Sequence, residues 1–270
     1  MYMKTKLICS DIDGTLLNKE RELSTRTIAA IKKHKGIPFI LISSRMPQAM
    51  RHLQQELNIS HLPLIAYNGG LIVDGNNVLH STEITVDCMA SIDEFCSSTS
   101  LHLSLYHRDE WYVPTMDYWA KREQNNTKVT PQVQQVKTTL QQWEKEEKGA
   151  HKIMCMGDEH EIDLLVSFLE KEFTDTIIGY RSKATYLEIS PAAISKKTAI
   201  EYLLKTNYPE LNLSNVLAFG DNYNDIEMLT SVGLGIAVQN AKTAVLAIAD
   251  KTTLSNIEDG VAVFLDTLLK

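Results

Sequence analysis

The first and last parts of the chain show two patterns of apolar and polar positions. Residues 7–9, 37–42, 64–67 and 216–219 are apolar runs bounded by polar turns, whereas the stretches between them repeat apolar residues every three to four positions. The short runs are typical of buried strands and the longer stretches of helices. Strands that alternate with helices predict an α/β fold with a parallel sheet, in which ligands bind beyond the carboxyl ends of the strands.

Capping and turn residues support this pattern. Ser24 is a suitable N-cap for a helix that ends near Gly36, and Pro47 suits the first turn of a helix that runs to Leu57. Residues 71–79 instead hold two short apolar runs around a polar turn that contains glycine, which predicts a hairpin.

The middle of the chain follows a different pattern and contains no obvious catalytic string. Here the sequence predicts helices near residues 86–98, 116–125 and 161–173, and a charged run at 144–148 that forms a solvated helix face. After this region the patterns of the first part resume. We therefore expect a discontinuous core domain, residues 1–82 and 186–270, and an inserted α/β unit, residues 83–185.

Two carboxylates follow the first apolar run directly. Asp11 and Asp13 are separated by one residue, so in an extended chain they project to the same side. At about 4 Å and an effective dielectric of about 20, their repulsion is on the order of 4 kcal/mol. A cation or a shared proton must therefore accompany the pair. Gly14 permits a backbone conformation that other residues resist, and the Thr15 hydroxyl can turn back to the main chain.

Other polar side chains occupy the same kind of position. Ser43 and Asn68 follow the next two predicted strands, so both should lie at the same edge of the sheet as Asp11. Lys196 or Lys197 lies at the start of a predicted helix, where a positive charge opposes the helix dipole and requires a nearby anion. The register of the sequence favours Lys196.

The polar string that follows residues 216–219 is the most specific functional signal after the string that contains Asp11 and Asp13. Asp221 and Asp225 lie four residues apart with Asn224 between them, at the end of a predicted strand. One acidic residue here caps the next helix. Capping requires only one such residue, whereas two carboxylates with an amide suit a hard cation that prefers oxygen ligands, such as Mg²⁺.

Composition narrows the class of protein. The chain has 270 residues, 44% hydrophobic and 23% charged, with a formal net charge of −7. This charge disfavours binding to nucleic acid or to an anionic membrane, and no stretch approaches the roughly 20 apolar residues that span a bilayer. We therefore expect a cytoplasmic protein. The four cysteines are widely spaced, which favours buried free thiols over a metal site.

Four strings carry a family resemblance: those at Asp11, at Ser43, at Lys196 and at residues 221–225. In this order they resemble the motifs of the haloacid dehalogenase (HAD) superfamily, and the last, acidic string resembles that of the Cof-type sugar-phosphatase subfamily. The resemblance covers the whole chain and implies a Rossmann-like parallel-sheet core with an inserted α/β cap domain that determines substrate specificity. Two positions depart from the family pattern: Ser44 and Lys197 replace the glycines that commonly precede Arg45 and follow Lys196. The first departure alters the turn, but Arg45 remains available to contact the substrate or the cap.

The resemblance also implies a reaction, a Mg²⁺-dependent hydrolysis of small phosphomonoesters through an aspartyl-phosphate. Asp11 would attack phosphorus, and Asp13 would act as general acid and then as general base. Mg²⁺ would bind the Asp11 carboxylate, the Asp13 carbonyl and Asp221, and Asp225 would orient Lys196 or a metal-bound water. The residues implied to bind phosphate or substrate are Ser43, Arg45, Asn68, Lys196 and Asn224.

Two rival functions remain at this point. A phosphosugar mutase uses the same aspartyl-phosphate but returns the phosphoryl group to a sugar, and a non-catalytic phosphosugar-binding protein would keep only the fold. The expected partner is a small phosphorylated metabolite, with no nucleic acid and no membrane, and the expected state is a monomer or a weak homo-oligomer.

Overall fold

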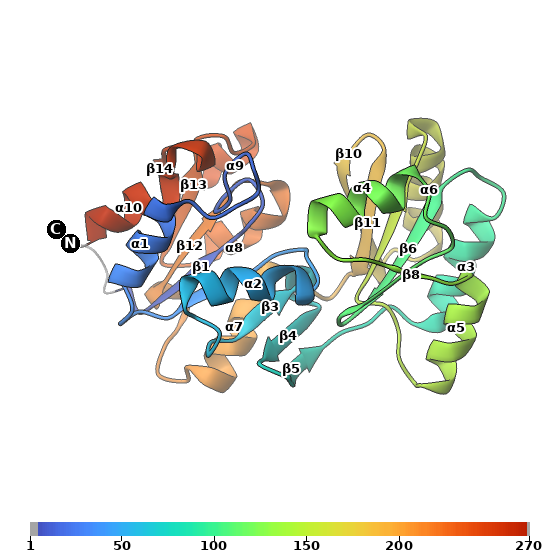
Figure 1. Cartoon of the computed structure of the whole chain (residues 1–270), viewed down its shortest axis with the longest axis horizontal. Coiled ribbons are helices and arrows are strands. Elements are labelled where there is room, and N and C mark those ends of the chain that lie inside the picture. Colours follow the sequence, from blue (N-terminus) through green and yellow to red (C-terminus); the bar gives the residue numbers. More distant parts are fainter. Residues whose placement is uncertain (1–4, 269–270) are drawn as a thin grey trace. The chain divides into compact units, whose positions relative to one another are not determined.

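The computed structural model describes residues 5–268, which form two compact units (Figure 1). The first unit contains residues 5–44, 50–79 and 195–268, and the second contains residues 45–49 and 80–194. Each unit is built on its own β-sheet, so the two are described separately.

The main sheet of the first unit is fully parallel, with the strand order β14-β13-β12-β1-β2. Its central strand, β1 (Leu7–Ser10), lies between β12 (Val216–Gly220) and β2 (Phe39–Leu41), and β13 (Leu234–Val238) and β14 (Lys251–Thr253) continue the sheet. Every residue of β1, β2 and β12 is buried, as expected for parallel strands covered on both faces. The predicted parallel α/β core is confirmed.

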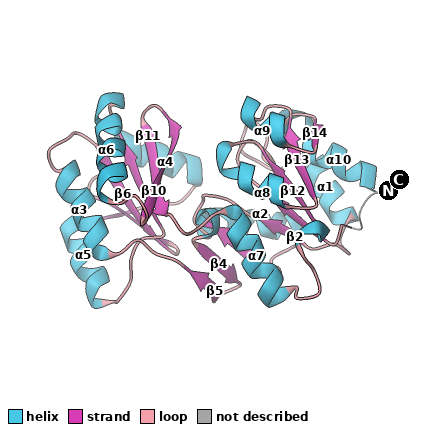
Figure 2. Ribbon diagram, turned by 180° about the vertical axis from the view of Figure 1, so that it is seen from behind, coloured by secondary structure: helices cyan, strands magenta, loops and turns pink. Residues whose placement is uncertain are grey.

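Helices cover both faces of this sheet (Figures 1 and 2). Ser24 caps the first helix by accepting a hydrogen bond from the Thr27 backbone N–H, as predicted, although the helix ends at Lys33, before Gly36. The helices of the unit are α1 (Thr25–Lys33), α2 (Gln48–Leu57), α7 (Lys196–Asn207), α8 (Ile226–Ser231), α9 (Thr243–Ile248) and α10 (Gly260–Leu268). The last of these, and β14, were not anticipated from the sequence.

One predicted strand pairs differently from expectation. β3 (Leu64–Ala66) pairs antiparallel with β4 (Leu71–Asp74) and, with β5 (Asn77–Ser81), forms a separate three-stranded sheet. A parallel bridge joins Ile65 of β3 to Ile42, the residue after β2, and the Ser43 backbone N–H donates to the Ile65 carbonyl (3.1 Å). The turn after β3 reverses the chain at once, so β4 becomes the neighbour of β3. The predicted hairpin of β4 and β5 is confirmed.

The second unit is a six-stranded mixed sheet with the order β10-β11-β9-β6-β7-β8. All neighbouring pairs are antiparallel except β7 and β8. The strands are β6 (His102–His107), β7 (Glu110–Val113), β8 (Gln132–Val133), β9 (Lys152–Met156), β10 (Ile177–Lys183) and β11 (Tyr186–Pro191). Because β11 pairs with β9 and β10, the second unit runs to residue 194, beyond the end at residue 185 that the sequence suggested.

Three helices, α3 (Val86–Cys96), α5 (Val136–Lys145) and α6 (Glu159–Glu172), bury an apolar core against one face of this sheet. On the opposite face lies α4 (Tyr118–Thr127), whose Trp119 ring contacts the Tyr186 ring of β11 with centroids 5.5 Å apart. The sequence analysis predicted a helix face at 144–148, but α5 begins earlier, at Val136, and ends at Lys145. Its start was missed because polar residues surround the few apolar side chains that it buries. The four cysteines are free thiols and are buried, as predicted.

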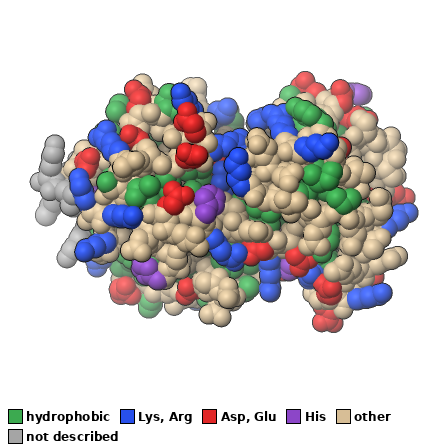
Figure 3. Space-filling view, viewed as in Figure 1, with side chains coloured by type: hydrophobic (Ala, Val, Ile, Leu, Met, Phe, Trp, Pro, Cys, Tyr) green, Lys and Arg blue, Asp and Glu red, His purple; other side chains and the backbone are tan. Residues whose placement is uncertain are grey.

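The surface carries charges of both signs. Figure 3 shows lysine and arginine side chains interspersed with acidic ones on the face that it draws. Among the described residues, no helix is long and apolar enough to cross a membrane.

Candidate active site

Asp11 is the first residue after the central strand β1. Its backbone N–H donates to the carbonyl of Phe219 in β12 (3.0 Å), and its carboxylate is buried. Because β1 and β12 are parallel and in register, the residues after β12 reach the same edge of the sheet. The carboxyl ends of the two strands therefore bring Asp11 and the 221–225 string together, as predicted for a parallel sheet.

Lys196 joins the two acidic segments. Its Nζ donates to Asp11 Oδ1 (2.5 Å) and to Asp225 Oδ1 (2.6 Å), and the residue is 1% exposed. It is the first residue of α7, whose N-terminus is closed by a capping box between Ser195 and Thr198. Lys196 therefore enters the cluster, whereas Lys197 lies within 4 Å of surface carboxylates.

Asp225 is fully buried, and its carboxylate fixes neighbouring groups through hydrogen bonds. Its Oδ1 accepts from Lys196, and its Oδ2 accepts from the backbone N–H groups of Asp221 (2.9 Å) and Asn222 (3.0 Å). A Cβ atom at Gly220 would lie 2.6 Å from the Asp225 side chain, so glycine is required there. Both carboxylate oxygens of Asp225 are thus committed to protein donors.

Asp221 contacts Gly14 and Thr15, which follow Asp13 in the sequence. The Thr15 hydroxyl donates to Asp221 Oδ1 (3.1 Å), where the sequence analysis expected it to turn to the main chain. Gly14 adopts a φ of +84°, and a Cβ atom at this position would lie 2.4 Å from Asp221 Oδ2. The expected conformational role of Gly14 is confirmed, and the structure adds a second reason for glycine, the close approach of Asp221.

The cluster carries an excess of negative charge. Three carboxylates, those of Asp11, Asp221 and Asp225, have oxygens within 4.8 Å of one another, against the single ammonium of Lys196. Burial raises the pKa of Asp11 well above its usual range despite Lys196, and the charges of Asp225 and Asp221 add to the rise. Burial, followed by the charge of Asp225, raises the pKa of Asp221 to about 6. The Lys196 pKa is raised by the two carboxylates, which outweigh the effect of its burial.

This electrostatic imbalance fits a divalent cation. Asp11 Oδ2 is buried and accepts no hydrogen bond from any residue that the structure describes. The cluster of three carboxylates and one ammonium retains two uncompensated charges when all four groups are ionised. Both oxygens of Asp225 already accept hydrogen bonds, whereas Asp11 Oδ2 accepts none and Asp221 accepts through Oδ1, so Asp11 and Asp221 are the carboxylates better placed to hold Mg²⁺ through hard oxygen ligands.

The phosphate-binding candidates form a second group beside the first unit's sheet. Asn224 Nδ2 donates to Asn68 Oδ1 (3.0 Å), and the Asn68 backbone N–H donates to the carbonyl of Ser43 (2.8 Å). Asn68 adopts a φ of +55°, a conformation that asparagine tolerates well. The structure therefore brings Ser43, Asn68 and Asn224 together.

Two other predicted site residues have different surroundings. Asp13 is exposed, two residues beyond the buried Asp11. Arg45 belongs to the second unit, where it is buried and donates through Nη1 to the carbonyl of Ala49 (3.2 Å). Sequence reasoning also missed Asn240, whose Nδ2 donates to the carbonyl of Gly14 (2.7 Å). Its position two residues after β13 was a signal that could have found it, because that strand ends at the same edge of the sheet.

Comparison with known proteins agrees with this geometry. Residues 8–265 match the family model of haloacid dehalogenase-like hydrolases. The chain is 30% identical over 269 residues to a candidate phosphatase of Haemophilus influenzae, covering 98% of each chain. It is 31% identical to the 5-amino-6-(5-phospho-D-ribitylamino)uracil phosphatase YcsE of Bacillus subtilis, covering 95% of this chain and 93% of that one.

The solved structures extend the comparison to the fold. A haloacid dehalogenase-like hydrolase from Bacteroides thetaiotaomicron is 27% identical, with a TM-score of 0.88 over 98% of this chain and 100% of its own. Sequence and structure therefore agree over both units: this chain belongs to the haloacid dehalogenase-like hydrolase family and is a phosphatase of that family.

Proposed function

We propose that this phosphatase is Mg²⁺-dependent and hydrolyses small phosphomonoesters through a phosphorylated Asp11. The observation that carries the proposal is the state of the Asp11 carboxylate. One oxygen is fixed by Lys196, and the other is buried without a hydrogen bond from any described residue, at the carboxyl end of the central strand. A carboxylate held in this way is positioned to act as a nucleophile or as a metal ligand.

Asp11, Asp221 and the Asp13 carbonyl would hold the metal ion, as expected from the resemblance. When bound, Mg²⁺ would supply the positive charge that the cluster lacks and would neutralise the charge of the phosphoryl group. Thr15 supports this role because its hydroxyl fixes the orientation of the Asp221 carboxylate. Asp225, with both oxygens occupied, acts on Lys196 and on the loop backbone.

The chain's own residues then divide the reaction into two transfers. An oxygen of Asp11 forms a bond to phosphorus while the ester P–O bond breaks, and Asp13 gives its proton to the departing alkoxide. Asp13 then takes a proton from water, the water oxygen attacks phosphorus, and the bond to Asp11 breaks to release inorganic phosphate. Exposure of Asp13 suits a group that exchanges protons with an alcohol and with water.

Fixed donors would hold the phosphoryl oxygens during both steps. Lys196 brings a buried positive charge that needs no reorganisation, because two carboxylates already fix it. Ser43 and Asn224 are the neutral donors in this group, and Asn68 fixes the Asn224 amide.

The proposed substrates are sugar phosphates and related phosphorylated metabolites. The related phosphatase of Bacillus subtilis is named for a substrate with a phosphorylated ribityl chain, a polyol phosphate. The second unit is the candidate for selecting the leaving group, because it contains no catalytic string, and Arg45 is the candidate for contacting the substrate.

A screen of phosphorylated metabolites with purified protein and Mg²⁺ tests the proposal. Steady release of inorganic phosphate that Asp11→Asn abolishes would support hydrolysis through Asp11. A requirement for a sugar bisphosphate activator, with no net phosphate release, would point to a mutase. Binding of sugar phosphates without turnover would point to a non-catalytic binding protein.

A further inference from the structure

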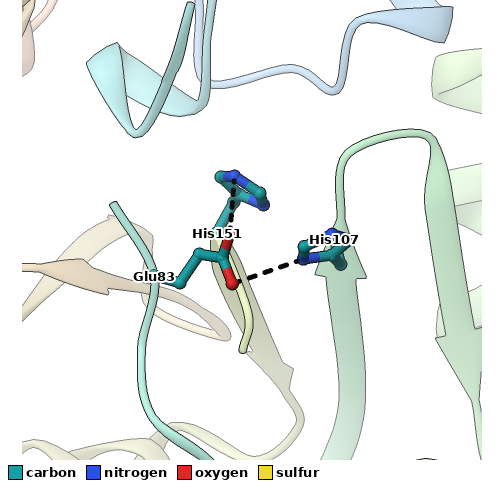
Figure 4. A group of neighbouring side chains, drawn as sticks. All are labelled: Glu83, His107 and His151. Carbon is teal, nitrogen blue, oxygen red and sulfur yellow. Dashed lines mark ion pairs between the residues drawn. The ribbon is translucent and has the colours of Figure 1, made fainter. Parts of the chain in front are cut away.

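A second cluster of metal-binding side chains lies inside the second unit. Glu83 precedes α3, His107 ends β6, and His151 directly precedes β9. Figure 4 shows both imidazoles turned toward the Glu83 carboxylate. His107 Nδ1 lies 3.7 Å from Glu83 Oε2, and His151 Nε2 lies 3.7 Å from Glu83 Oε1. The three groups each offer a ligand atom within 4.8 Å of the others.

The carboxylate of this cluster is firmly oriented. Ser81 Oγ donates to Glu83 Oε1 (2.6 Å), and the Gly149 backbone N–H donates to Glu83 Oε2 (2.7 Å). Each oxygen has capacity for a second interaction, and each lies 3.7 Å from one histidine nitrogen. Outer hydrogen bonds of this kind commonly orient carboxylate ligands in metal sites.

Both histidines are buried, and burial lowers the pKa of each. The neighbouring His107 and Arg108 lower the pKa of His151 further, to about 3. His107 Nδ1 lies 2.8 Å from the Gly149 carbonyl, so this nitrogen carries the ring proton. The Arg108 backbone N–H donates to His151 Nδ1 (3.2 Å), so the His151 proton is on Nε2, 3.0 Å from Ser81 Oγ.

We propose that Glu83, His107 and His151 bind a Zn²⁺ ion. Two imidazoles and one carboxylate are a donor set typical of zinc. Ligand atoms at 2.0–2.1 Å in a tetrahedron are about 3.3–3.4 Å apart. The two 3.7 Å separations therefore require a small contraction, and the two imidazole nitrogens, which lie within 4.8 Å of each other, must also approach. At 3.7 Å, each histidine nitrogen is too far from its Glu83 oxygen for a direct hydrogen bond, and the ion would lie between these atoms.

Binding keeps each imidazole neutral. The ring proton moves to Nε2 in His107 and to Nδ1 in His151, and the freed nitrogen binds the ion. This change removes the hydrogen bond from His107 to the Gly149 carbonyl, whose oxygen is then available as a fourth ligand. It also removes two hydrogen bonds of His151, the one that Nδ1 accepts from the Arg108 backbone N–H and the one that Nε2 donates to Ser81 Oγ, and the new metal–ligand bonds must outweigh these losses.

An ion can reach the cluster from the surface of the same unit. A hollow of about 380 Å³ is lined by residues that include Glu83, Trp143, Lys148 and Gly149. The Glu83 side chain is 24% exposed, whereas the His151 side chain behind it is fully buried. The carboxylate therefore lies at the entrance and the imidazoles lie inside.

Calorimetric titration of the full-length protein with Zn²⁺ tests the site. The protein is first stripped with a chelator and then held at neutral pH in excess Mg²⁺, which under the proposed function would bind the carboxylates of Asp11 and Asp221. We expect one Zn²⁺ per chain. Glu83→Gln and His107→Gln should each weaken its binding by more than about tenfold. Zn²⁺ should raise the melting temperature of the wild type but not of these variants.

His102→Gln is the matched control, because His102 is also a buried histidine of β6 that contacts a carboxylate, Asp117 (2.7 Å). It should keep wild-type Zn²⁺ affinity even if it lowers stability. Glu83→Gln retains the acceptor for the Gly149 N–H, so it remains informative if His107→Gln does not fold. The proposal is overturned if the wild type takes up no Zn²⁺ in excess Mg²⁺, or if folded Glu83→Gln binds Zn²⁺ as tightly as the wild type.

Discussion

Replacing Lys196 by methionine should destabilise the metal-free first unit strongly. Methionine retains an unbranched apolar stem but removes the ammonium that lies 2.5 Å from Asp11 and 2.6 Å from Asp225. At these distances and an effective dielectric of about 20, each attraction is on the order of 6–7 kcal/mol. Desolvation of the charges offsets much of this gain, and removing one partner from a buried pair costs about 3–5 kcal/mol.

The expected loss translates into a large shift in melting temperature. Domains of 150–250 residues lose about 2–4 °C per kcal/mol, so Lys196→Met should melt about 6–20 °C below the wild type in EDTA at neutral pH. Calorimetry and urea unfolding would both report the loss. The loss should shrink as the pH is lowered, because protonation of the carboxylates removes the uncompensated charge.

The neighbouring lysine provides a matched control. The Lys197 side chain is 31% exposed, and its carboxylate neighbours are 3.7–3.8 Å away. Exposed pairs of this kind contribute about 0–1 kcal/mol, so Lys197→Met should unfold within about 1 kcal/mol of the wild type. Equal losses in the two variants, or a loss below about 1 kcal/mol in Lys196→Met, would show that the cluster is not held by Lys196.

Three further outcomes are expected. Asp11→Asn should abolish phosphate release with an unchanged circular dichroism spectrum, and activity within tenfold of the wild type would exclude Asp11 as the nucleophile. Asp221→Ala should raise the Mg²⁺ concentration needed for half-maximal activity, and an unchanged requirement would mean that Asp221 does not bind the metal. EDTA should stop wild-type turnover, and added Mg²⁺ should restore it. In the metal-free protein the pKa of Asp221 is raised to about 6, above its ordinary 3.8. The native state then binds more protons than the unfolded state between about pH 4 and 6, so stability should fall by up to about 3 kcal/mol as the pH rises through this window. Asp221→Asn should flatten that part of the stability profile, and an equally steep fall in the variant would assign it to other groups.

The main sheet and the acidic cluster could be predicted because their signals are local. Asp11 and Asp221 each follow an apolar strand directly, and Lys196 begins a helix next to its N-cap. In a parallel sheet such positions meet at one edge, so a strand assignment is sufficient to bring them together.

Pairing partners and weak helices were harder to predict. β3 is as apolar as the parallel strands, and only the tight turn after Ala66 makes it antiparallel to β4. α5 buries Val136, Leu140 and Trp143 at helical spacing, but polar residues dominate its sequence. Residues 186–191 belong to the second unit because they form hydrogen bonds with β9 and β10. The composition of that strand does not reveal these pairing partners.

The Glu83 cluster shows the same limit in its clearest form. His107 and His151 lie 44 positions apart in the sequence, and no local motif joins them. Alternation along β6 places His107 on the same face as Leu103 and Leu105, and alternation toward β9 places His151 on the face of Ile153. Each pattern predicts a histidine at the margin of the apolar core, but only the antiparallel register, with Tyr106 opposite Lys152, brings the two rings together. Metal ligands contributed by separate antiparallel strands therefore require the pairing to be known first, whereas ligands at the ends of parallel strands do not.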